Sequence, residues 1–194
     1  EMESEMNKKL DRKVLDNLKY HFLDTTAIFT EATPILATFE TGVAGMSNEV
    51  SLNTRLLGIG SGYAGLGWVF AKGRDASRKL FKIDDKTKER TQHLHDSLYN
   101  SAFSLVLSPI FYLAAGARDF KEITIGSLCG AGVGLVNGGS VGYTIDAFRD
   151  LTGLKESERL PELVRRQNSK VKKGLVGLLI GGSIALTAGI YSTN

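Results

Sequence analysis

The charged residues of this 194-residue chain are strongly segregated along the sequence. They crowd into residues 1–19, 72–96 and 146–173 and are sparse elsewhere. The charge-poor segments are each close to the ~20 residues that a helix needs to cross the core of a bilayer. These segments are 23–44, 54–71, 99–117, 123–145 and 174–191. The pattern predicts an all-α membrane protein with five transmembrane helices.

The basic residues of the connecting segments alternate between the two sides of such a membrane. Five Lys or Arg precede or begin the first charge-poor segment, eight follow the second and eight follow the fourth. The opposite connections hold only Arg55, Arg118 and Lys121. Because cytoplasmic loops are enriched in Lys and Arg, we expect a cytoplasmic N-terminus and an outer C-terminus. The first 20 residues are charged and lack the apolar region of a signal peptide, so we interpret them as a cytoplasmic amphipathic helix or arm. Together with the five spans, this predicts a multi-pass protein of the cell (inner) membrane.

Glycine recurs at every fourth position of the fourth segment, which contains the sequence GSLCGAGVGLVNGGSVG. The glycines are Gly126, Gly130, Gly134, Gly138 and Gly142. On a helix, a four-residue spacing places them on one face. In a membrane, such a face lets a neighbouring helix approach closely and gains van der Waals contact. We therefore predict one helix over 123–145 that packs through glycine, and the same spacing recurs at residues 58 and 62 and at residues 177 and 181.

Matching short sequences indicate two copies of a two-helix unit. Asp75-Ala-Ser-Arg78 is followed 71 residues later by Asp146-Ala-Phe-Arg149. Asp24-Thr25 is followed 72 residues later by Asp96-Ser97. Parallel repeats of this kind occur in transporters that bind substrate between their halves. The predicted organisation is a cytoplasmic amphipathic arm (1–22), a four-span core of two tandem units (23–152), a basic cytoplasmic linker (153–173) and a fifth span (174–194).

Several polar residues lie within the predicted spans or at their ends, where burial is costly and function is the default explanation. They are Asp24, Glu31, Glu40, Arg55, Asp96, Ser108 and Asn137. Acids in a membrane cavity can carry protons, and a cation beside an anion suits the two charges of an amino acid. We predict that these residues form a substrate and proton pathway. As structural alternatives, Asp24 and Asp96 would cap helices. Similarly, Glu40 would be solvated at the outer interface, and Arg55 would extend to the headgroups.

Two other patterns point to different chemistry but lack the context that it requires. Residues 60–65, GSGYAG, match the dinucleotide-binding pattern GxGxxG, but the chain offers no strands for a βαβ unit. His93 and His95 are spaced as half of a metal site, but no further cluster of cysteine or histidine lies nearby. We therefore expect no cofactor, no metal and no enzymatic activity.

A series of motifs occurs in order between about residue 20 and residue 152. The motifs are Asp24-Thr25, Gly45-Met46-Ser47-x-Glu49-x-Ser51-x-x-x-Arg55, Arg74-Asp75, Asp96, Ser108-Pro109 and Gly142-Tyr143-x-x-Asp146-x-x-Arg149-x-Leu151. Together they resemble the bacterial L-alanine exporter family, and the second motif is the most specific. The resemblance implies a small four-span inner-membrane exporter driven by the proton gradient. It also implies that Arg55 and Asp96 are essential charges and that Asp24 and Glu40 are supporting acids.

The chain departs from this family in its basic linker, its fifth span, its higher glycine content and Phe111, where the family has tyrosine. The expected function is proton-coupled export of L-alanine or a similar small neutral amino acid. Because four spans are few to enclose a pathway, we expect a homo-oligomer, with the bilayer, a small amino acid and protons as partners and no nucleic acid. One alternative is a non-transporting glycine-zipper protein, and the other is a passive channel.

Overall fold

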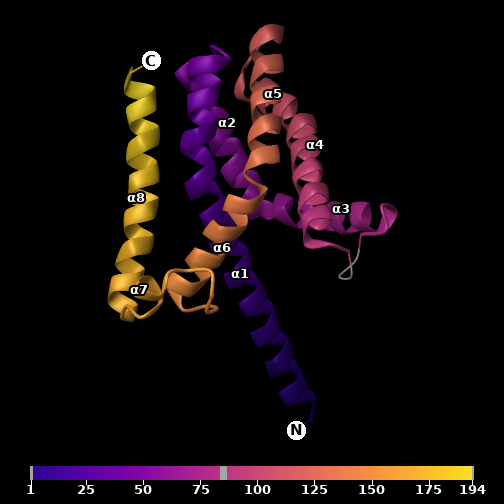
Figure 1. The fold of residues 1–194 in the computed structure, drawn as a ribbon, viewed down its shortest axis with the longest axis vertical. Helices are drawn as coiled ribbons and strands as arrows, with labels where there is room; N and C mark the ends of the chain where they lie inside the picture. The colour runs from indigo at the N-terminus through magenta and orange to yellow at the C-terminus, as the bar shows by residue number, and fades with distance from the viewer. Residues whose placement is uncertain (1, 84–86, 194) are drawn as a thin grey trace.

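The computed structural model describes residues 2–83 and 87–193, and every element of regular structure in these ranges is a helix (Figure 1). The helices are α1 (Met2–Thr38), η1 (Phe39–Val43), α2 (Asn48–Ser61), η2 (Gly62–Leu66), α3 (Gly67–Leu80), α4 (Glu89–Ala115), α5 (Phe120–Val136), α6 (Gly138–Thr152), α7 (Glu162–Arg165) and α8 (Ser169–Thr193). Both η elements are short π-helical turns that continue the preceding α-helix. The prediction of an all-α protein is confirmed.

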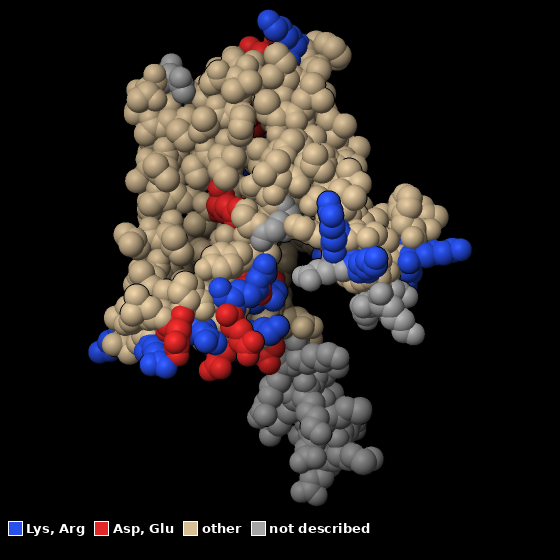
Figure 2. Space-filling model, in the orientation of Figure 1, with Lys and Arg blue, Asp and Glu red and all other residues tan. Residues whose placement is uncertain are grey.

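Among the described residues, two helices are long and apolar enough to cross a membrane, as judged by length and composition. They cover Arg90–Ala115 and Ser169–Thr193, with mean hydropathies of 1.4 and 1.8. Large apolar side chains on both helices are exposed, including Val106 (66%) and Leu178 (71%). On the face shown in Figure 2, uncharged residues cover most of the middle, and charged side chains gather mainly toward the end where the N-terminus lies. These features favour association with a membrane.

The N-terminal segment continues directly into the first predicted span. Helix α1 runs from Met2 to Thr38, and the π-turn η1 extends it to Val43, so no helix boundary falls at residue 22. The side chains of residues 1–13, which form part of the amphipathic arm predicted over 1–22, lie outside the described residues. Pro34 lies inside α1, as expected for the first charge-poor segment.

Both glycine-rich segments of the core are interrupted rather than continuous. In the second segment the chain turns at Gly65, whose φ of 115° lies in a region that glycine adopts readily. After this turn, α3 lies across the end of α4 (Figure 1). The helix predicted over 123–145 is likewise divided, because α5 ends at Val136 and α6 begins at Gly138. Two consecutive glycines after Asn137 weaken the helix there, each by roughly 1 kcal/mol relative to alanine.

The glycines of α5 allow close packing within the chain. A Cβ at Gly126 would lie 2.5 Å from Met46 Cε, and one at Gly134 would lie 3.3 Å from backbone atoms of Asn100 on α4. Gly130 faces Ser108, whereas Gly142 lies on the separate helix α6 beside Arg159. Gly138 lies outside the residues whose side-chain surroundings are described. The five glycines therefore do not share one face, because the interruption at residue 137 separates the last from the first three.

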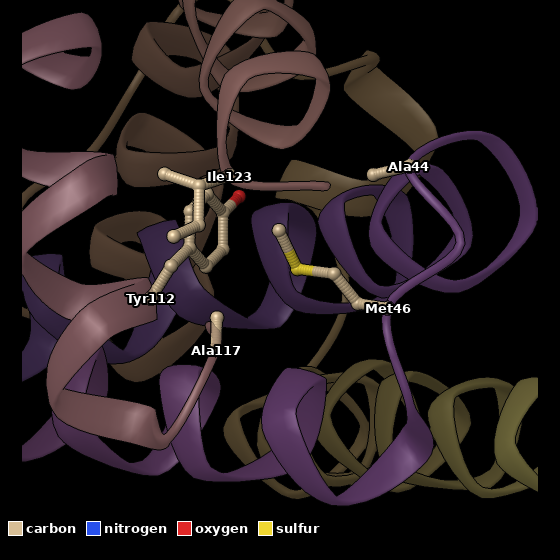
Figure 3. Packing of buried hydrophobic residues seen from close by; sticks show 5 residues of the cluster. All are labelled: Ala44, Met46, Tyr112, Ala117 and Ile123. Atoms are coloured by element: carbon tan, nitrogen blue, oxygen red, sulfur yellow. The ribbon is translucent and has the colours of Figure 1, made fainter. Parts of the chain in front are cut away.

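A small apolar cluster joins the end of η1, the end of α4 and the start of α5. It contains Ala44, Met46, Tyr112, Ala117 and Ile123, all of them buried. In Figure 3 the side chains of Tyr112 and Ile123 lie together and face that of Met46. The cluster fixes the two helix ends around Tyr112, whose ring is 1% exposed.

Helix α8 packs against α1 and α6 and is bound by polar contacts at both ends. At its start, Lys172 Nζ lies 2.7 Å from Oδ1 of Asp150, a residue of α6 that is 3% exposed. The other oxygen of Asp150 accepts a hydrogen bond of 2.9 Å from the backbone N–H of Ser157. At the far end of α8, Asn48 Nδ2 donates to the carbonyl of Tyr191 over 2.8 Å. The last predicted span is therefore attached to the core rather than separate from it.

Gly134 and Gly132 offer a matched test of the glycine packing, because only a Cβ at Gly134 would meet a neighbour within 4 Å. We expect Gly134→Leu to lower the free energy of unfolding by about 1–3 kcal/mol, since overpacking forces the backbone of α4 to move. Gly132→Leu enters open space and replaces glycine by a better helix former, so it should cause no loss. Unfolding of the purified protein in detergent measures both effects, and equal losses would contradict the packing described above.

The contact between Asp150 and Lys172 predicts a dependence of stability on pH. Burial alone would raise the pKa of Asp150, but the hydrogen bonds from Lys172 and from the Ser157 N–H outweigh it and lower the pKa from its ordinary 3.8. A lowered pKa stabilises the folded protein above the unfolded pKa, and this contribution is lost as the pH falls through the folded value. We expect the difference in melting temperature between wild type and Asp150→Asn to be constant from about pH 7 to pH 5 and to shrink below about pH 4.

Glu162→Gln is the control for this measurement, because the Glu162 side chain on α7 is 63% exposed. Its melting temperature should follow that of the wild type over the whole range. A difference for Asp150→Asn that stayed constant down to about pH 2 would show that this carboxylate does not carry the effect.

Candidate functional site

Glu40 lies in the π-turn η1 and is only 1% exposed. Ser51 Oγ donates to Glu40 Oε2 over 2.6 Å, and the Tyr112 hydroxyl donates to Oε1 over 3.0 Å. Arg55 Nη2 also donates to Oε1 and forms an ion pair with it. A buried carboxylate without such partners costs several kcal/mol, so these three donors are what make the burial of Glu40 tolerable. The expectation of a solvated Glu40 at the outer interface is therefore wrong.

The donors reach Glu40 because of where their helices begin and end. Helix α2 starts after Ser47, whose side chain accepts a hydrogen bond from the Val50 N–H. Ser51 and Arg55 are four residues apart on this helix and therefore share the face toward Glu40. Tyr112 lies in the last turns of α4, and its ring belongs to the cluster shown in Figure 3. Its packing directs the hydroxyl toward the carboxylate.

A fourth side chain comes from the C-terminal helix. The Tyr191 hydroxyl lies 3.0 Å from Ser51 Oγ, and its carbonyl accepts the hydrogen bond from Asn48. We call Glu40, Ser51, Arg55, Tyr112 and Tyr191 the Glu40 centre. It joins the end of the first helix to α2, α4 and α8. Helices far apart in the sequence thus meet at one carboxylate.

Arg55 has hydrogen-bonding capacity that the described part of the chain does not use. Its side chain is 13% exposed, and its Nε atom is buried without a hydrogen-bond partner among the described residues. Guanidinium carries five N–H donors in a planar fork, a geometry that suits carboxylates. The proposal that Arg55 extends freely to lipid headgroups does not fit this position. The centre instead places a cation with a spare donor beside a buried anion.

Asp24 and Asp96 lie in two ion pairs away from the Glu40 centre. Arg149 of α6 donates from Nε to Asp24 Oδ1 over 2.7 Å and from Nη2 to Oδ2. Arg78 of α3 donates from Nε to Asp96 Oδ1 over 2.8 Å and from Nη2 to Oδ2. Paired bonds of this kind fix both position and direction. Each Asp lies well inside a helix, so the alternative that these residues cap helices is wrong.

Glu31 lies on α1 between Asp24 and Glu40 and contacts the junction of α5 and α6. Ser140 Oγ donates to Glu31 Oε1, whereas Oε2 is buried without a partner in the described ranges. Asn137 lies three residues before Ser140, and its Nδ2 is likewise buried and unpartnered there. Buried polar atoms without partners are rare in proteins and point to a role or to bound solvent.

The predicted site residues therefore fall into separate groups rather than one cluster. Glu40 and Arg55 bind each other, Glu31 and Asn137 lie near the α5–α6 junction, and Ser108 faces Gly130 in helix packing. A groove of about 610 Å³ is lined by residues of α2, by Ala64 of η2 and by Ala114 of α4, none of them in the Glu40 centre. The pathway predicted from the sequence is thus not an open cavity shared by all these residues in this structure.

Three members of the Glu40 centre were missed in the sequence. Ser51 stands four residues before Arg55, so helical spacing alone was sufficient to find it. Tyr112 follows Glu40 by 72 residues, which is the offset of the predicted repeat. Tyr191 has no comparable signal, because it lies beyond the repeat.

Comparison of the chain with known protein families, with curated proteins and with solved structures gives no match.

The Glu40–Arg55 pair predicts a strong coupling of two substitutions. Arg55→Leu should lower the free energy of unfolding by about 3–5 kcal/mol, because it leaves the buried carboxylate without its counter-ion. In a Glu40→Gln background the same substitution should cost less, since glutamine carries no charge. A double-mutant cycle measured by unfolding in detergent should give a coupling above about 1 kcal/mol.

Tyr112→Phe removes only the hydroxyl that reaches Glu40 and should also destabilise the protein. Tyr143→Phe is the matched control, because Tyr143 is 41% exposed. In the double-mutant cycle of Glu40→Gln and Arg55→Leu, strictly additive losses of stability would show that the two residues do not depend on each other.

Proposed function

We propose that the chain is a multi-pass cell-membrane protein with five spans formed by α1–η1, α2–η2, α4, α5 and α8. The two termini lie at opposite ends of the long axis, which supports an odd number of spans (Figure 1). Helix α5 has 17 residues and so extends about 25 Å, close to the ~30 Å thickness of a bilayer core. The N-terminus lies in the cytoplasm, and the C-terminus lies outside. Helices α3 and α6 then follow their spans on the cytoplasmic side with their basic residues.

The four-span core consists of two tandem units, residues of which correspond at an offset of 72. Ser47 and Asp119 cap α2 and α5 in the same way, each accepting a hydrogen bond from the N–H three residues later. Gly65 and Asn137 mark the interruptions of the second and fourth segments. Asp24 and Asp96 each bind an arginine through two bonds. The caps and the interruptions lie outside the short sequence matches and therefore support the repeat independently of them.

On this topology, the function is outward transport of L-alanine or a similar small neutral amino acid, coupled to the proton gradient. The observation that carries the proposal is the buried Glu40–Arg55 pair with its unpartnered Arg55 Nε. A zwitterion presents one carboxylate and one ammonium, which match these two charges. The carboxylate of the substrate binds the unpartnered N–H of Arg55 Nε, and the ammonium of the substrate binds Glu40. A proton and the ammonium then compete for one carboxylate, which is a basis for coupling.

The motifs that resemble the bacterial L-alanine exporter family favour this substrate among small zwitterions. Gly45-Met46-Ser47-x-Glu49-x-Ser51-x-x-x-Arg55 supplies two members of the Glu40 centre, and Met46 belongs to the cluster beside it. The buried apolar cluster next to the centre disfavours a large side chain on the substrate. The protein forms a homo-oligomer in the membrane, and on α8 Gly177 and Gly181 face open space available for such a contact.

A transport measurement tests this function. Proteoliposomes loaded with labelled L-alanine should release it faster when the outside is made acidic. Arg55→Ala and Glu40→Gln should lower this efflux by at least about tenfold, a ratio that corresponds to 1.4 kcal/mol of lost interaction. Glu162→Gln on the exposed helix α7 is the matched control and should transport normally.

The result also separates the alternatives. Efflux that does not respond to the pH gradient would indicate a passive channel. Absence of efflux for a folded, reconstituted protein would favour the non-transporting glycine-zipper protein.

A further inference from the structure

The two ion pairs Asp24–Arg149 and Asp96–Arg78 are related by the internal repeat. Asp96 follows Asp24 by 72 residues, and Arg149 follows Arg78 by 71. Exchanging the two units therefore converts one pair into the other. The geometry agrees, because in both pairs Nε donates to Oδ1 and Nη2 donates to Oδ2. The exposed fractions of the side chains are also alike, between 23% and 27%.

Each pair joins one unit to the other. Asp24 belongs to the first unit and Arg149 to the second, whereas Asp96 belongs to the second and Arg78 to the first. The hydrogen bond between Glu40 and Tyr112 also crosses between the units, and these residues occupy equivalent positions. Two equivalent residues that touch each other lie near the axis that relates the units. The axis therefore passes close to the Glu40 centre.

The ion pairs lie well inside α1 and α4, and the Glu40 centre lies near the C-terminal ends of the same two helices. Sixteen residues separate Asp24 from Glu40 on the first helix and Asp96 from Tyr112 on α4, which is about 24 Å in each case at the helical rise. Both pairs thus lie at the predicted cytoplasmic end, where the basic loops lie. A relative movement of the two units that opened this end would have to break both pairs together.

We propose that Asp24–Arg149 and Asp96–Arg78 are two equivalent cytoplasmic latches, which hold the units together and must part in concert before the Glu40 centre opens to the cytoplasm. Arg78 and Arg149 are then positioning residues of the transport cycle. This inference rests on the proposed transport function for its purpose, but the opening itself is measurable without transport. Ion pairs that are about a quarter exposed can exchange their partners for water, as a reversible closure requires.

Thiol accessibility at Ala27 tests the latches. Ala27 is 0% exposed and lies three residues inside Asp24 on the same helix, so its modification reports opening of the cytoplasmic end. In a Cys129→Ser background, Ala27→Cys should react slowly with a maleimide, both in detergent and in vesicles with the cytoplasmic face outward. Asp24→Asn and Asp96→Asn should each raise the rate about tenfold or more. The effect of Asp96→Asn is decisive, because this residue is in the other pair.

Two controls separate latch opening from general loosening. Asp146→Asn removes an Asp–Arg pair with Arg159 of the linker, which does not join the two units, so it should leave the rate unchanged. The reversed pair Asp24→Arg with Arg149→Asp should restore slow labelling. An unchanged rate for Asp96→Asn, or an equal increase for Asp146→Asn, would overturn the proposal. Normal latch behaviour without alanine efflux would instead refute the transport function alone.

Discussion

The rest of the structure depends on the burial of one carboxylate. Glu40 is 1% exposed, and moving a charge of this kind out of water costs several kcal/mol unless donors replace the lost hydration. Those donors come from α2 and α4, and Tyr191 of α8 binds one of them in turn. The helices must therefore meet at this point for the carboxylate to be satisfied. The apolar cluster beside it fixes Tyr112, so packing and charge compensation reinforce each other.

The two proposed units differ in their distribution of charge. The positions that correspond to Ser51 and Arg55 in the second unit are Ile123 and Ser127, and both are buried. Under the proposed repeat, caps, interruptions and glycine spacings recur, whereas Arg55, the charged partner of Glu40, has no charged counterpart in the second unit. A fully symmetric pair would bring two carboxylates together on the axis, where like charges repel. Replacing the second acid by Tyr112 turns that repulsion into a hydrogen bond and leaves one centre in each chain.

The sequence is most informative about features that depend on helical periodicity or on the distribution of charged residues along the chain. The helical content was predicted correctly, and Glu40 and Arg55, selected as charges at span ends, lie together in the Glu40 centre. The interruption at Asn137 was missed, because a four-residue glycine spacing resembles a continuous helix whether or not the chain turns within it. The partners of Asp24 and Asp96 were also missed. Sequence identifies a costly charge, but only the folded chain shows which distant arginine compensates it.

Glycine and charge have different mechanical consequences in this chain. The contact between α4 and α5 is the most extensive between helices, and it forms where glycine lets the backbones approach. Dispersion contacts of this kind are short-ranged and numerous, so separating these helices would lose many of them at once. The contacts at Asp24 and Asp96 depend instead on a few polar atoms that water can replace. The α4–α5 pair is therefore suited to move as one body, and the ion pairs at Asp24 and Asp96 are the contacts that a movement would break first.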